Sequence, residues 1–290
     1  MKILITGGNG QLGNSIKKIS TGFPDHTYIF TDVEELDISS EEETESFFHK
    51  FNPDYCINCA GYTAVDNAES DKEKAFLLNS GAVKILAKIT EKYNCKFIHL
   101  STDYVFSGRS WHPYKETDIP DADSVYGKSK LEGEKHIINS RHAIIIRTSW
   151  LYSEFGANFF KTIANLMNEK EELKVVFDQV GTPTYAGDLA LAIMTMISRS
   201  EETSFKNGIY HYSNEGVTSW YDFTKEIANL KGYKGKIHPV ESTEFPRPAP
   251  RPPYSVLNKS LIKRNYKIDI PHWRVSLEHC YNDYIIQKDL

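Results

Sequence analysis

A glycine-rich segment close to the N-terminus restricts the fold of this chain more than any other feature. The segment TGGNGQLG, residues 6–13, follows an apolar run at residues 2–6, and its glycines fit both GxGxxG, through Gly8, and GxxGxxG, through Gly7. Glycine there permits a tight turn and a close approach of the backbone to a pyrophosphate, while the helix N-terminus that follows offers N–H groups to the anion. The segment predicts a dinucleotide-binding loop. A glycine-rich turn without a ligand is the alternative.

Short apolar runs alternate with amphipathic stretches through the first half of the chain. We expect strands at residues 2–6, 27–31, 54–59, 97–101 and 143–147. We expect helices between them at residues 11–20, 40–51, 75–93 and 129–138. This alternation predicts an α/β fold with a Rossmann-type doubly wound parallel sheet, covered by helices on both faces and joined by right-handed crossovers.

The second half is less regular and predicts a smaller α/β lobe. We expect helices at residues 156–169, 186–198 and 219–230, the last capped by Ser219, and strands at residues 173–177 and 209–213. Five prolines in residues 245–253 predict an extended loop. We expect residues 1–150 with about 173–212 to form the dinucleotide-binding domain, the strand at 173–177 and the helix at 186–198 returning to its sheet. Residues 151–172 with about 213–290 are expected to form the smaller lobe.

An acidic residue follows the second expected strand at the distance that dinucleotide-binding folds use. Asp32 lies 19 residues after Gly13, close to the roughly 20 that separate the loop from the carboxylate on the adenine ribose. Because this carboxylate would repel a 2′-phosphate, NADH is the more natural cofactor and NADPH the second one. Asp37 and Ile38 are candidates for the adenine pocket; a helix N-cap before residues 39–41 is the compatible alternative.

Tyr126 and Lys130 stand four residues apart, so they share one face of the expected helix. Hydride transfer to a carbonyl needs a proton for the developing alkoxide, and a free tyrosine with a pKa of about 10 exchanges protons poorly at neutral pH. A nearby ammonium favours the phenolate and lowers that pKa. The pair predicts a catalytic tyrosine, and an ordinary surface helix is the alternative.

Hydroxyl side chains stand at the end of another expected strand. Ser101 and Thr102 follow the run at residues 97–101, where a parallel sheet binds its ligands. Either hydroxyl could hydrogen-bond the reacting oxygen of a substrate. A local turn formed by the hydroxyl is the alternative, and composition does not choose between the two residues.

Composition narrows the class of protein. The chain has 290 residues, a formal charge of −5 and 40% hydrophobic residues, which predicts a soluble protein of about two units without nucleic acid as its partner. No apolar run approaches the roughly 18 residues of a membrane helix, and the N-terminal run is too short for a signal peptide, so we expect a cytoplasmic protein without a membrane partner. Cys56 and Cys59 form a CxxC on an expected strand, where they point to opposite faces. We therefore expect no metal or redox site there.

Several segments together resemble the extended short-chain dehydrogenase/reductases and, more narrowly, the dTDP-4-dehydrorhamnose reductases. These are the glycine loop, NCAGYTAVDNAE at residues 58–69, STDYVF at 101–106 and YGKSK at 126–130. The resemblance continues through RTSWLY at 147–152, NF at 158–159, DQVGTPTY at 178–185 and RPPYSVL at 251–257. It covers nearly the whole chain, and the last four segments are more specific than the glycine loop.

The resemblance implies an enzyme of dTDP-rhamnose synthesis, a pathway to cell-surface polysaccharide. It implies NADH- or NADPH-dependent reduction of the C4 keto group of dTDP-4-dehydro-6-deoxy-L-mannose, also called dTDP-4-dehydro-L-rhamnose, to dTDP-L-rhamnose. In this reaction Thr102 would hold the keto oxygen and Tyr126 would donate the proton. Lys130 would bind the nicotinamide ribose and lower the pKa of Tyr126.

The resemblance also implies two sets of binding residues. The cofactor set is Gly7, Gly10, Gln11, Leu12, Gly13, Asp32, Asp37, Ile38, Gly61, Tyr62, Thr63, Tyr126 and Lys130. The substrate set, in the sugar-nucleotide-binding lobe and at the domain edge, is Val65, Thr102, Asp103, Tyr104, Trp150 and Arg251. For Trp150, core packing is an equal alternative. Arg251 in a rigid proline loop suits a diphosphate, which arginine binds in a bidentate manner, and a surface arginine is the alternative.

One position departs from the family pattern. Some members dimerise around a magnesium ion held by acidic residues, one of them in the first helix, and the residue aligned to it here is Ser15. We therefore predict no structural magnesium, and a monomer or a homodimer.

Three other functions are alternatives to the reductase. Dehydratases of the superfamily carry Thr-Asp-Glu where this chain has Tyr104 in third place, and a tyrosine cannot replace that glutamate as a base at neutral pH. A sugar-nucleotide epimerase would keep the same tyrosine and lysine, but the C-terminal segments argue against it. A non-catalytic NAD(P)-binding regulatory subunit would be expected to lose the tyrosine, the lysine or the glycine loop, and this chain has all three.

Overall fold

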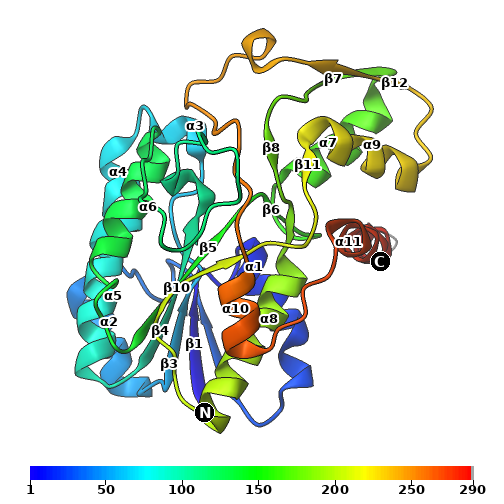
Figure 1. The fold of residues 1–290 in the computed structure, drawn as a ribbon. Helices are drawn as coiled ribbons and strands as arrows, with labels where there is room; N and C mark the ends of the chain where they lie inside the picture. The colour runs from blue at the N-terminus through cyan, green and yellow to red at the C-terminus, as the bar shows by residue number, and fades with distance from the viewer. Residues whose placement is uncertain (289–290) are drawn as a thin grey trace.

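A parallel sheet forms the centre of the computed structural model, which describes residues 1–288 (Figure 1). Within that part of the chain its six strands lie in the order β10-β5-β4-β3-β1-β2, and every neighbouring pair is parallel. The strands are β1 Lys2–Thr6, β2 Thr27–Thr31, β3 Tyr55–Asn58, β4 Lys96–Thr102, β5 Ala143–Thr148 and β10 Gly208–Tyr212. The strand order reverses between β1 and β3, and sheets of this kind bind ligands at the carboxyl ends of the strands at such a point. The predicted doubly wound α/β sheet is confirmed.

Helices cover both faces of this sheet because successive side chains of a strand point to opposite sides. In β1, Ile3 and Ile5 pack in one core cluster and Leu4 packs in another. The first cluster includes side chains from α1 Gln11–Ile19, α8 Ala186–Glu202 and α10 Ser260–Tyr266. The second includes side chains from α2 Glu41–Phe51 and α5 Ala82–Lys92. Figure 1 places α2 and α5 on one side of the strands and α8 and α10 on the other.

Local sequence sets the ends of these helices. The Ser40 hydroxyl accepts the N–H of Glu43 at the start of α2, and Asn52 ends that helix in the left-handed region at φ 44°. Helix α6, Val125–Lys135, begins four residues before the expected position 129 because Ser124 caps it. None of the helices within residues 1–288 is long and apolar enough to cross a membrane.

A smaller lobe packs around an aromatic core of its own. Its helices are α7 Phe159–Glu169, α9 Trp220–Lys231 and α11 Trp273–Lys288. Its strand pairs are β7 Glu172–Val176 with β12 Lys236–Val240, β8 Val180–Gly181 with β11 Thr218–Ser219, and β6 Leu151–Tyr152 with β9 Thr184–Tyr185. Ser219 accepts the N–H of Asp222 at 3.0 Å and caps α9, as predicted.

The prediction that the strand near residues 173–177 returns to the main sheet is wrong. This strand is β7, and it pairs with β12 in the smaller lobe. Its side chains alternate, with Leu173 and Val175 buried and Lys174 exposed, whereas all four residues of β3 in the main sheet are buried. A strand covered on one face only cannot take a place between two helical layers. The helix at 186–198 does return to the main sheet as α8, and β10 joins its edge.

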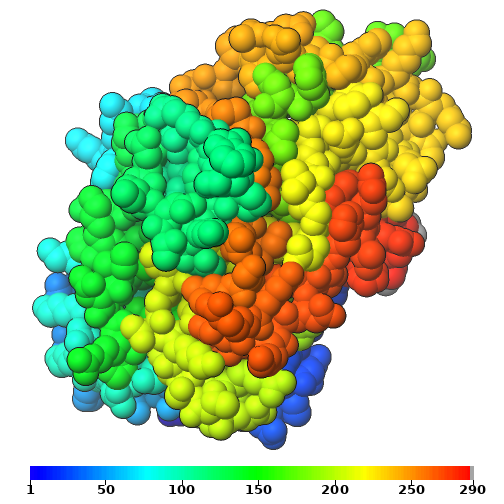
Figure 2. Space-filling model, viewed as in Figure 1, coloured from blue at the N-terminus to red at the C-terminus, as the bar shows by residue number. Residues whose placement is uncertain are grey.

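The proline-rich stretch at residues 245–253 contains neither helix nor strand, as predicted. After it, the chain runs from the smaller lobe back to the main unit, where α10 packs on the sheet. Isolated backbone bridges join Tyr254 to Val180 and Leu257 to Tyr114 along this path. Figure 2 shows the stretch in orange, lying between the two parts of the molecule. The two parts are therefore interleaved along the chain.

Candidate active site

The glycine loop lies at the carboxyl end of β1, beside the end of β3. Gly7 has a φ of 65°, and a Cβ built on it would lie 2.7 Å from the backbone nitrogen of Ala60. A Cβ on Gly13 would lie 2.6 Å from the carbonyl oxygen of Gly7. No side chain caps the N-terminus of α1, where Gly10 is in an extended conformation. The loop thus keeps backbone close to backbone and leaves a helix N-terminus for an anion, so these residues fit a dinucleotide.

The carboxylate of Asp32 lies directly against this loop. It accepts the backbone N–H of Asn9 at 3.1 Å and that of Val33 at 2.9 Å. Asp32 directly follows β2 and therefore lies against the glycine loop, at the place where the ribose next to the pyrophosphate would lie. The carboxylate also holds the loop in place.

Three residues of the predicted cofactor set use their side chains for structure. Leu12 and Ile38 are buried in the two core clusters beside the sheet, so only their backbone can face a ligand. The side chain of Gln11 reaches the smaller lobe, where its Oε1 accepts Ser153 Oγ at 3.0 Å and Asn158 Nδ2 at 2.9 Å.

Asp37 also has a local task. Its carboxylate accepts both the backbone N–H and the hydroxyl of Ser39, at 2.9 and 2.7 Å. The N-cap of α2 is Ser40, three residues later. The helix cap that was the alternative role for this segment is therefore formed by Ser40 and not by Asp37.

Tyr126, Lys130 and Thr102 come together at the carboxyl end of β4. The Tyr126 and Thr102 side chains lie close enough for Thr102 to act on the tyrosine hydroxyl. The Thr102 hydroxyl donates to Asp103 at 3.0 Å. Lys130 is buried and donates its Nζ to the carbonyl oxygen of Leu100 at 2.7 Å. Ser101 points away from this group, because its hydroxyl donates to Glu134 at 2.5 Å. The geometry therefore favours Thr102 over Ser101 as the residue that faces a substrate.

Burial controls the protonation of this group. Loss of solvent raises the pKa of Tyr126 to about 12, against the smaller opposing effect of the neighbouring Thr102 side chain. Loss of solvent lowers the pKa of Lys130 to about 8. The expected lowering of the Tyr126 pKa by Lys130 is not seen, since the ammonium is hydrogen-bonded to the β4 backbone. A tyrosine with a raised pKa retains its proton at neutral pH, which suits a proton donor.

Asp103 and Tyr104 follow Thr102 and lie beside the tyrosine. Burial raises the pKa of Asp103 to about 7, and its Oδ2 has no hydrogen-bond partner among the described residues. The Tyr104 ring meets the Tyr126 ring edge to face, with centroids 5.5 Å apart. Burial also raises the pKa of Tyr104, so its hydroxyl is no base at neutral pH.

Sequence reasoning missed Asn79, which holds the segment after β3. Asn79 lies in a π-helical turn, η2 Leu77–Gly81, that interrupts the helix expected at residues 75–93. Its Oδ1 accepts the N–H of Tyr62 at 2.9 Å, and its Nδ2 donates to the Tyr62 carbonyl at 3.0 Å and to Ser129 at 3.0 Å. A Cβ on Gly61 would lie 2.8 Å from Asn79 Oδ1 and 3.4 Å from Lys130 Nζ. Gly61 and Tyr62 thus lie beside the lysine, whereas Thr63 is exposed.

Arg251 is held by a carboxylate that the sequence did not indicate. Its Nη2 lies 2.9 Å from Asp66 Oδ2, and its Nη1 donates to the carbonyl of Ala249 at 3.0 Å. The guanidinium lies close enough to Tyr104 to oppose the rise in its pKa. Arg251 and Tyr104 also line the same small cavity, so the proline loop lies beside the catalytic group. Val65, the neighbour of Asp66, packs in the cluster that contains Tyr126. Arg251 is therefore partly buried at the site and is no free surface arginine.

Trp150 is packed firmly at the end of β5. Its indole stacks on Trp220 with ring centroids 3.6 Å apart, and a Cβ on Gly181 would lie 2.7 Å from it. Its φ of 48° is rare for a tryptophan, and such strain is common at functional sites. The structure thus shows the packing that was the alternative for Trp150, at the edge of the candidate site. The partner Trp220 is 70 positions later in the sequence.

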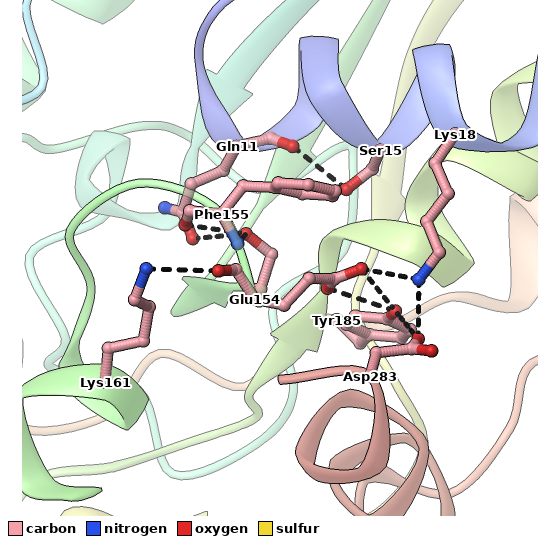
Figure 3. Close-up of polar contacts among 9 residues, drawn as sticks. Gln11, Ser15, Lys18, Glu154, Phe155, Lys161, Tyr185 and Asp283 are labelled. Atoms are coloured by element: carbon pink, nitrogen blue, oxygen red, sulfur yellow. Dashed lines mark hydrogen bonds and ion pairs between the residues drawn. The ribbon is translucent and has the colours of Figure 1, made fainter. Parts of the chain in front are cut away.

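A polar network joins the two parts of the molecule beside α1 (Figure 3). Lys18 Nζ lies 2.7 Å from Glu154 and 2.7 Å from Asp283, and the Tyr185 hydroxyl contacts both carboxylates at 3.2 and 3.0 Å. Ser15 donates to the Gln11 carbonyl of its own helix at 2.9 Å. No group of three or more His, Cys, Asp or Glu side chains within residues 1–288 is arranged to hold a metal ion. The absence of a structural magnesium stays a prediction.

The two cysteines of the CxxC lie on opposite sides of the sheet. Cys56 is buried in one core cluster, and Cys59 packs against the other. Burial raises the pKa of Cys59 to about 12, so its thiol is protonated at neutral pH.

Comparison with known proteins gives consistent matches along the chain. The family described as "RmlD substrate binding domain" matches residues 1–286. A dTDP-4-dehydrorhamnose reductase of Aggregatibacter actinomycetemcomitans is 36% identical over 290 residues, covering 96% of this chain and 97% of that protein. A crystal structure of a dTDP-4-dehydrorhamnose reductase from Clostridium acetobutylicum has a TM-score of 0.92 at 41% identity, covering 99% of this chain and 100% of that one. The dTDP-4-dehydrorhamnose reductase of Bacillus anthracis, solved in complex with NADP, has a TM-score of 0.91 at 34% identity, covering 97% and 99%.

Proposed function

The chain belongs to the RmlD substrate binding domain family, with the dTDP-4-dehydrorhamnose reductases as its relatives, and from that premise we propose the reaction it catalyses. It is an NAD(P)H-dependent oxidoreductase that reduces the C4 keto group of dTDP-4-dehydro-L-rhamnose to give dTDP-L-rhamnose. The observation that carries this proposal is the meeting of the Thr102 and Tyr126 side chains at the carboxyl end of β4, with buried Lys130 beside them. This edge also holds the glycine loop.

The glycine loop and the end of β2 would hold the cofactor. The N-terminus of α1 would bind the pyrophosphate, and Asp32 would bind the adenine ribose beside the loop. Gly61, Tyr62 and Lys130 lie together farther along the sheet edge, where the nicotinamide ribose would lie. When bound, NADH or NADPH supplies the hydride to C4 of the sugar.

The side chains at the end of β4 handle the oxygen and its proton. The Thr102 hydroxyl would hydrogen-bond the keto oxygen, and Tyr126 would donate its phenolic proton as that oxygen gains negative charge. The raised pKa of Tyr126, about 12, keeps this proton on the tyrosine until the alkoxide forms. The ammonium of Lys130 would bind the nicotinamide ribose beside the tyrosine.

The smaller lobe and the domain edge would bind the sugar nucleotide. Arg251, fixed by Asp66, would neutralise the diphosphate, which arginine binds in a bidentate manner. Asp103, Tyr104, Val65 and Trp150 would face the sugar and the base. We assign residues 1–150 and the returning strand β10 with α8 to cofactor binding, and the smaller lobe to the sugar nucleotide.

The raised pKa of Tyr104 supports reduction over elimination. A dehydratase needs a carboxylate base in this place, and a buried tyrosine that retains its proton cannot remove one from the sugar. A reduction needs no base at this position. The site would then need only a proton donor, the role proposed for Tyr126.

The test is a direct assay of the purified protein. It is incubated with dTDP-4-dehydro-L-rhamnose and either NADH or NADPH, and the loss of the nicotinamide absorbance is followed. We expect a loss that depends on the sugar nucleotide and a product identified as dTDP-L-rhamnose. Oxidation of neither cofactor in the presence of this substrate would refute the proposed function.

A further inference from the structure

On the basis of the proposed function, we propose that Glu134 is a positioning residue for the reduction. It holds the end of β4 through Ser101, and it supplies the negative charge that keeps Lys130 protonated. Nothing in the resemblance assigned a role to Glu134.

Glu134 forms a buried, two-point ion pair with Arg147 of β5. Arg147 Nη2 lies 2.6 Å from Glu134 Oε2, and Arg147 Nε lies 2.9 Å from Oε1. The two side chains are only 1% and 2% exposed. A buried ion pair gains little stability over apolar side chains of the same volume, so stability alone gives no reason to have one here.

The same face of α6 meets the end of β4 at three points. Tyr126, Lys130 and Glu134 follow each other at intervals of four residues and so line one face of the helix. Tyr126 contacts Thr102, Lys130 donates to the carbonyl of Leu100, and Glu134 accepts the Ser101 hydroxyl.

Each of three consecutive residues of β4 therefore has a contact from this face. Glu134 forms the third contact, and it is fixed from the other side by Arg147. Loss of the Glu134 contact would free Ser101, the residue directly before the catalytic Thr102. The positioning role follows from this direct connection.

Glu134 is also the negative charge that acts on Lys130. Burial lowers the pKa of Lys130, and Glu134 acts in the opposite direction. Of the other groups that face the lysine, Cys59 retains its proton because burial raises its pKa to about 12. Burial lowers the pKa of His99 well below its usual value, so its imidazole is neutral. The lysine thus depends on Glu134 for an anionic partner.

Charges around the two ends of this arrangement do not replace Glu134. On the side of the tyrosine, Asp103 acts on Tyr126 and contacts Thr102. Glu116 and His211 lie on the other side of Arg147, and the guanidinium acts to lower the pKa of both groups. Burial lowers the pKa of His211 to about 3, so it is neutral when the enzyme works.

The test measures kcat/KM for the keto sugar against pH. In the wild type, activity should fall as pH rises through about 8, where Lys130 loses its proton. Glu134→Gln keeps the shape of the side chain and removes its charge. In this variant the fall should begin about one pH unit lower, because an uncharged neighbour no longer favours the ammonium.

Two further variants keep the test decisive if Glu134→Gln fails to fold around an unpaired Arg147. The double variant Glu134→Gln/Arg147→Met removes both buried charges, and it should fold and show a pH profile displaced in the same direction, by a smaller amount. Ser101→Ala keeps the charge of Glu134 and should lower kcat without moving the profile. Glu132→Gln is the matched control, because it changes a carboxylate of the same helix whose side chain is 42% exposed.

The outcomes separate the inference from the proposed function. A folded double variant with the wild-type pH profile would overturn the inference, and so would an equal displacement in Glu132→Gln. A double variant that does not fold would also count against it, because Glu134 would then be a structural residue. A wild type that does not reduce the sugar would overturn the proposed function and the inference with it.

Discussion

Burial sets the protonation of the single residues that are proposed to act in this site. Loss of solvent raises the pKa of Tyr126 to about 12 and lowers that of Lys130 to about 8, so both carry a proton at neutral pH. For a reduction this is the useful state, since the tyrosine has a proton to donate and the lysine has a charge with which to bind the nicotinamide ribose. The reverse reaction would need the tyrosinate, which the same burial disfavours.

Removal of the phenolic hydroxyl should affect the chemical step more than binding. Tyr126→Phe keeps the ring against Tyr104 and removes the proton donor, so kcat should fall about 10²- to 10⁴-fold with little change in KM. Steady-state kinetics measure the two constants. Tyr93→Phe is the control, because Tyr93 ends α5 before the start of β4, where its ring packs near Phe48, whereas the site lies at the carboxyl end of β4. A kcat of Tyr126→Phe within twofold of wild type would mean that another group donates the proton.

The carboxylate beside the glycine loop should set the choice between cofactors. In Asp32→Ala the ribose loses an acceptor and a 2′-phosphate loses a repulsive charge, so the ratio of kcat/KM for NADH over NADPH should fall about tenfold. Parallel assays with the two cofactors measure this ratio. Glu34→Ala, an exposed carboxylate two positions later, should leave it unchanged. The same ratio in Asp32→Ala as in wild type would contradict the ribose contact.

At the scale of elements, the carboxyl ends of β1, β3 and β4 and one face of α6 build the site. The π-helical turn η2 contributes through Asn79, which fixes the backbone of Tyr62 from both sides. Such turns within helices occur often at functional sites. The segment after β3 therefore has a defined distance from Lys130.

Substitution of Gly61 tests whether the distance between this segment and Lys130 matters for catalysis. In Gly61→Ala the new Cβ would meet Asn79 Oδ1 at 2.8 Å and Lys130 Nζ at 3.4 Å, so the segment must shift. We expect kcat/KM to fall about tenfold to a hundredfold, and stability to fall by about 1–3 kcal/mol. Kinetics and thermal unfolding measure the two effects. Gly22→Ala is the matched control, because nothing lies within 4 Å of its Cβ position. Unchanged kinetics in Gly61→Ala would show that this segment takes no part in catalysis.

Sequence patterns predicted the elements whose signals are local. The glycine loop, the tyrosine–lysine spacing and the Ser219 cap each depend on residues within one turn or one strand end. Strand β7 was misplaced, although Lys174 between two buried apolar residues already indicated a strand covered on one face. Asp66, Asn79 and Trp220 were missed because their partners are distant in sequence, and periodicity contains no information on such pairs.

At the scale of the whole molecule, a few polar contacts tie the smaller lobe to the main unit. Lys18 of α1 contacts Glu154 and Asp283, and Gln11 of the same helix accepts two hydrogen bonds from the segment after β6. One helix thus offers its N-terminus to the proposed cofactor site and its side chains to the smaller lobe. Relative movement of the two parts is limited at this point.

Loss of the ammonium should destabilise the chain. Lys18→Met leaves Glu154, whose side chain is 1% exposed, beside Asp283 without a cation. Breaking a buried pair costs several kcal/mol, and since Lys18 is itself 40% exposed we expect a loss of only about 1–3 kcal/mol. Chemical denaturation measures the free energy of unfolding. Lys17→Met, exposed on the same helix, should cost less than about 0.5 kcal/mol. Equal stabilities of Lys18→Met and wild type would show that the network has no net energetic value.

The interleaving of the two parts has a consequence for synthesis on the ribosome. One face of the main sheet is covered partly by α1 and otherwise by α8 and α10, and α10 comes from residues 260–266. A nascent chain that has reached residue 150 therefore displays an uncovered apolar surface. At typical elongation rates it waits on the order of ten seconds for the covering helices. A chain truncated at residue 150 would lack the covering helices, and that apolar surface would stay exposed. Residues 1–150 alone are therefore not expected to form a stable, independent cofactor-binding domain.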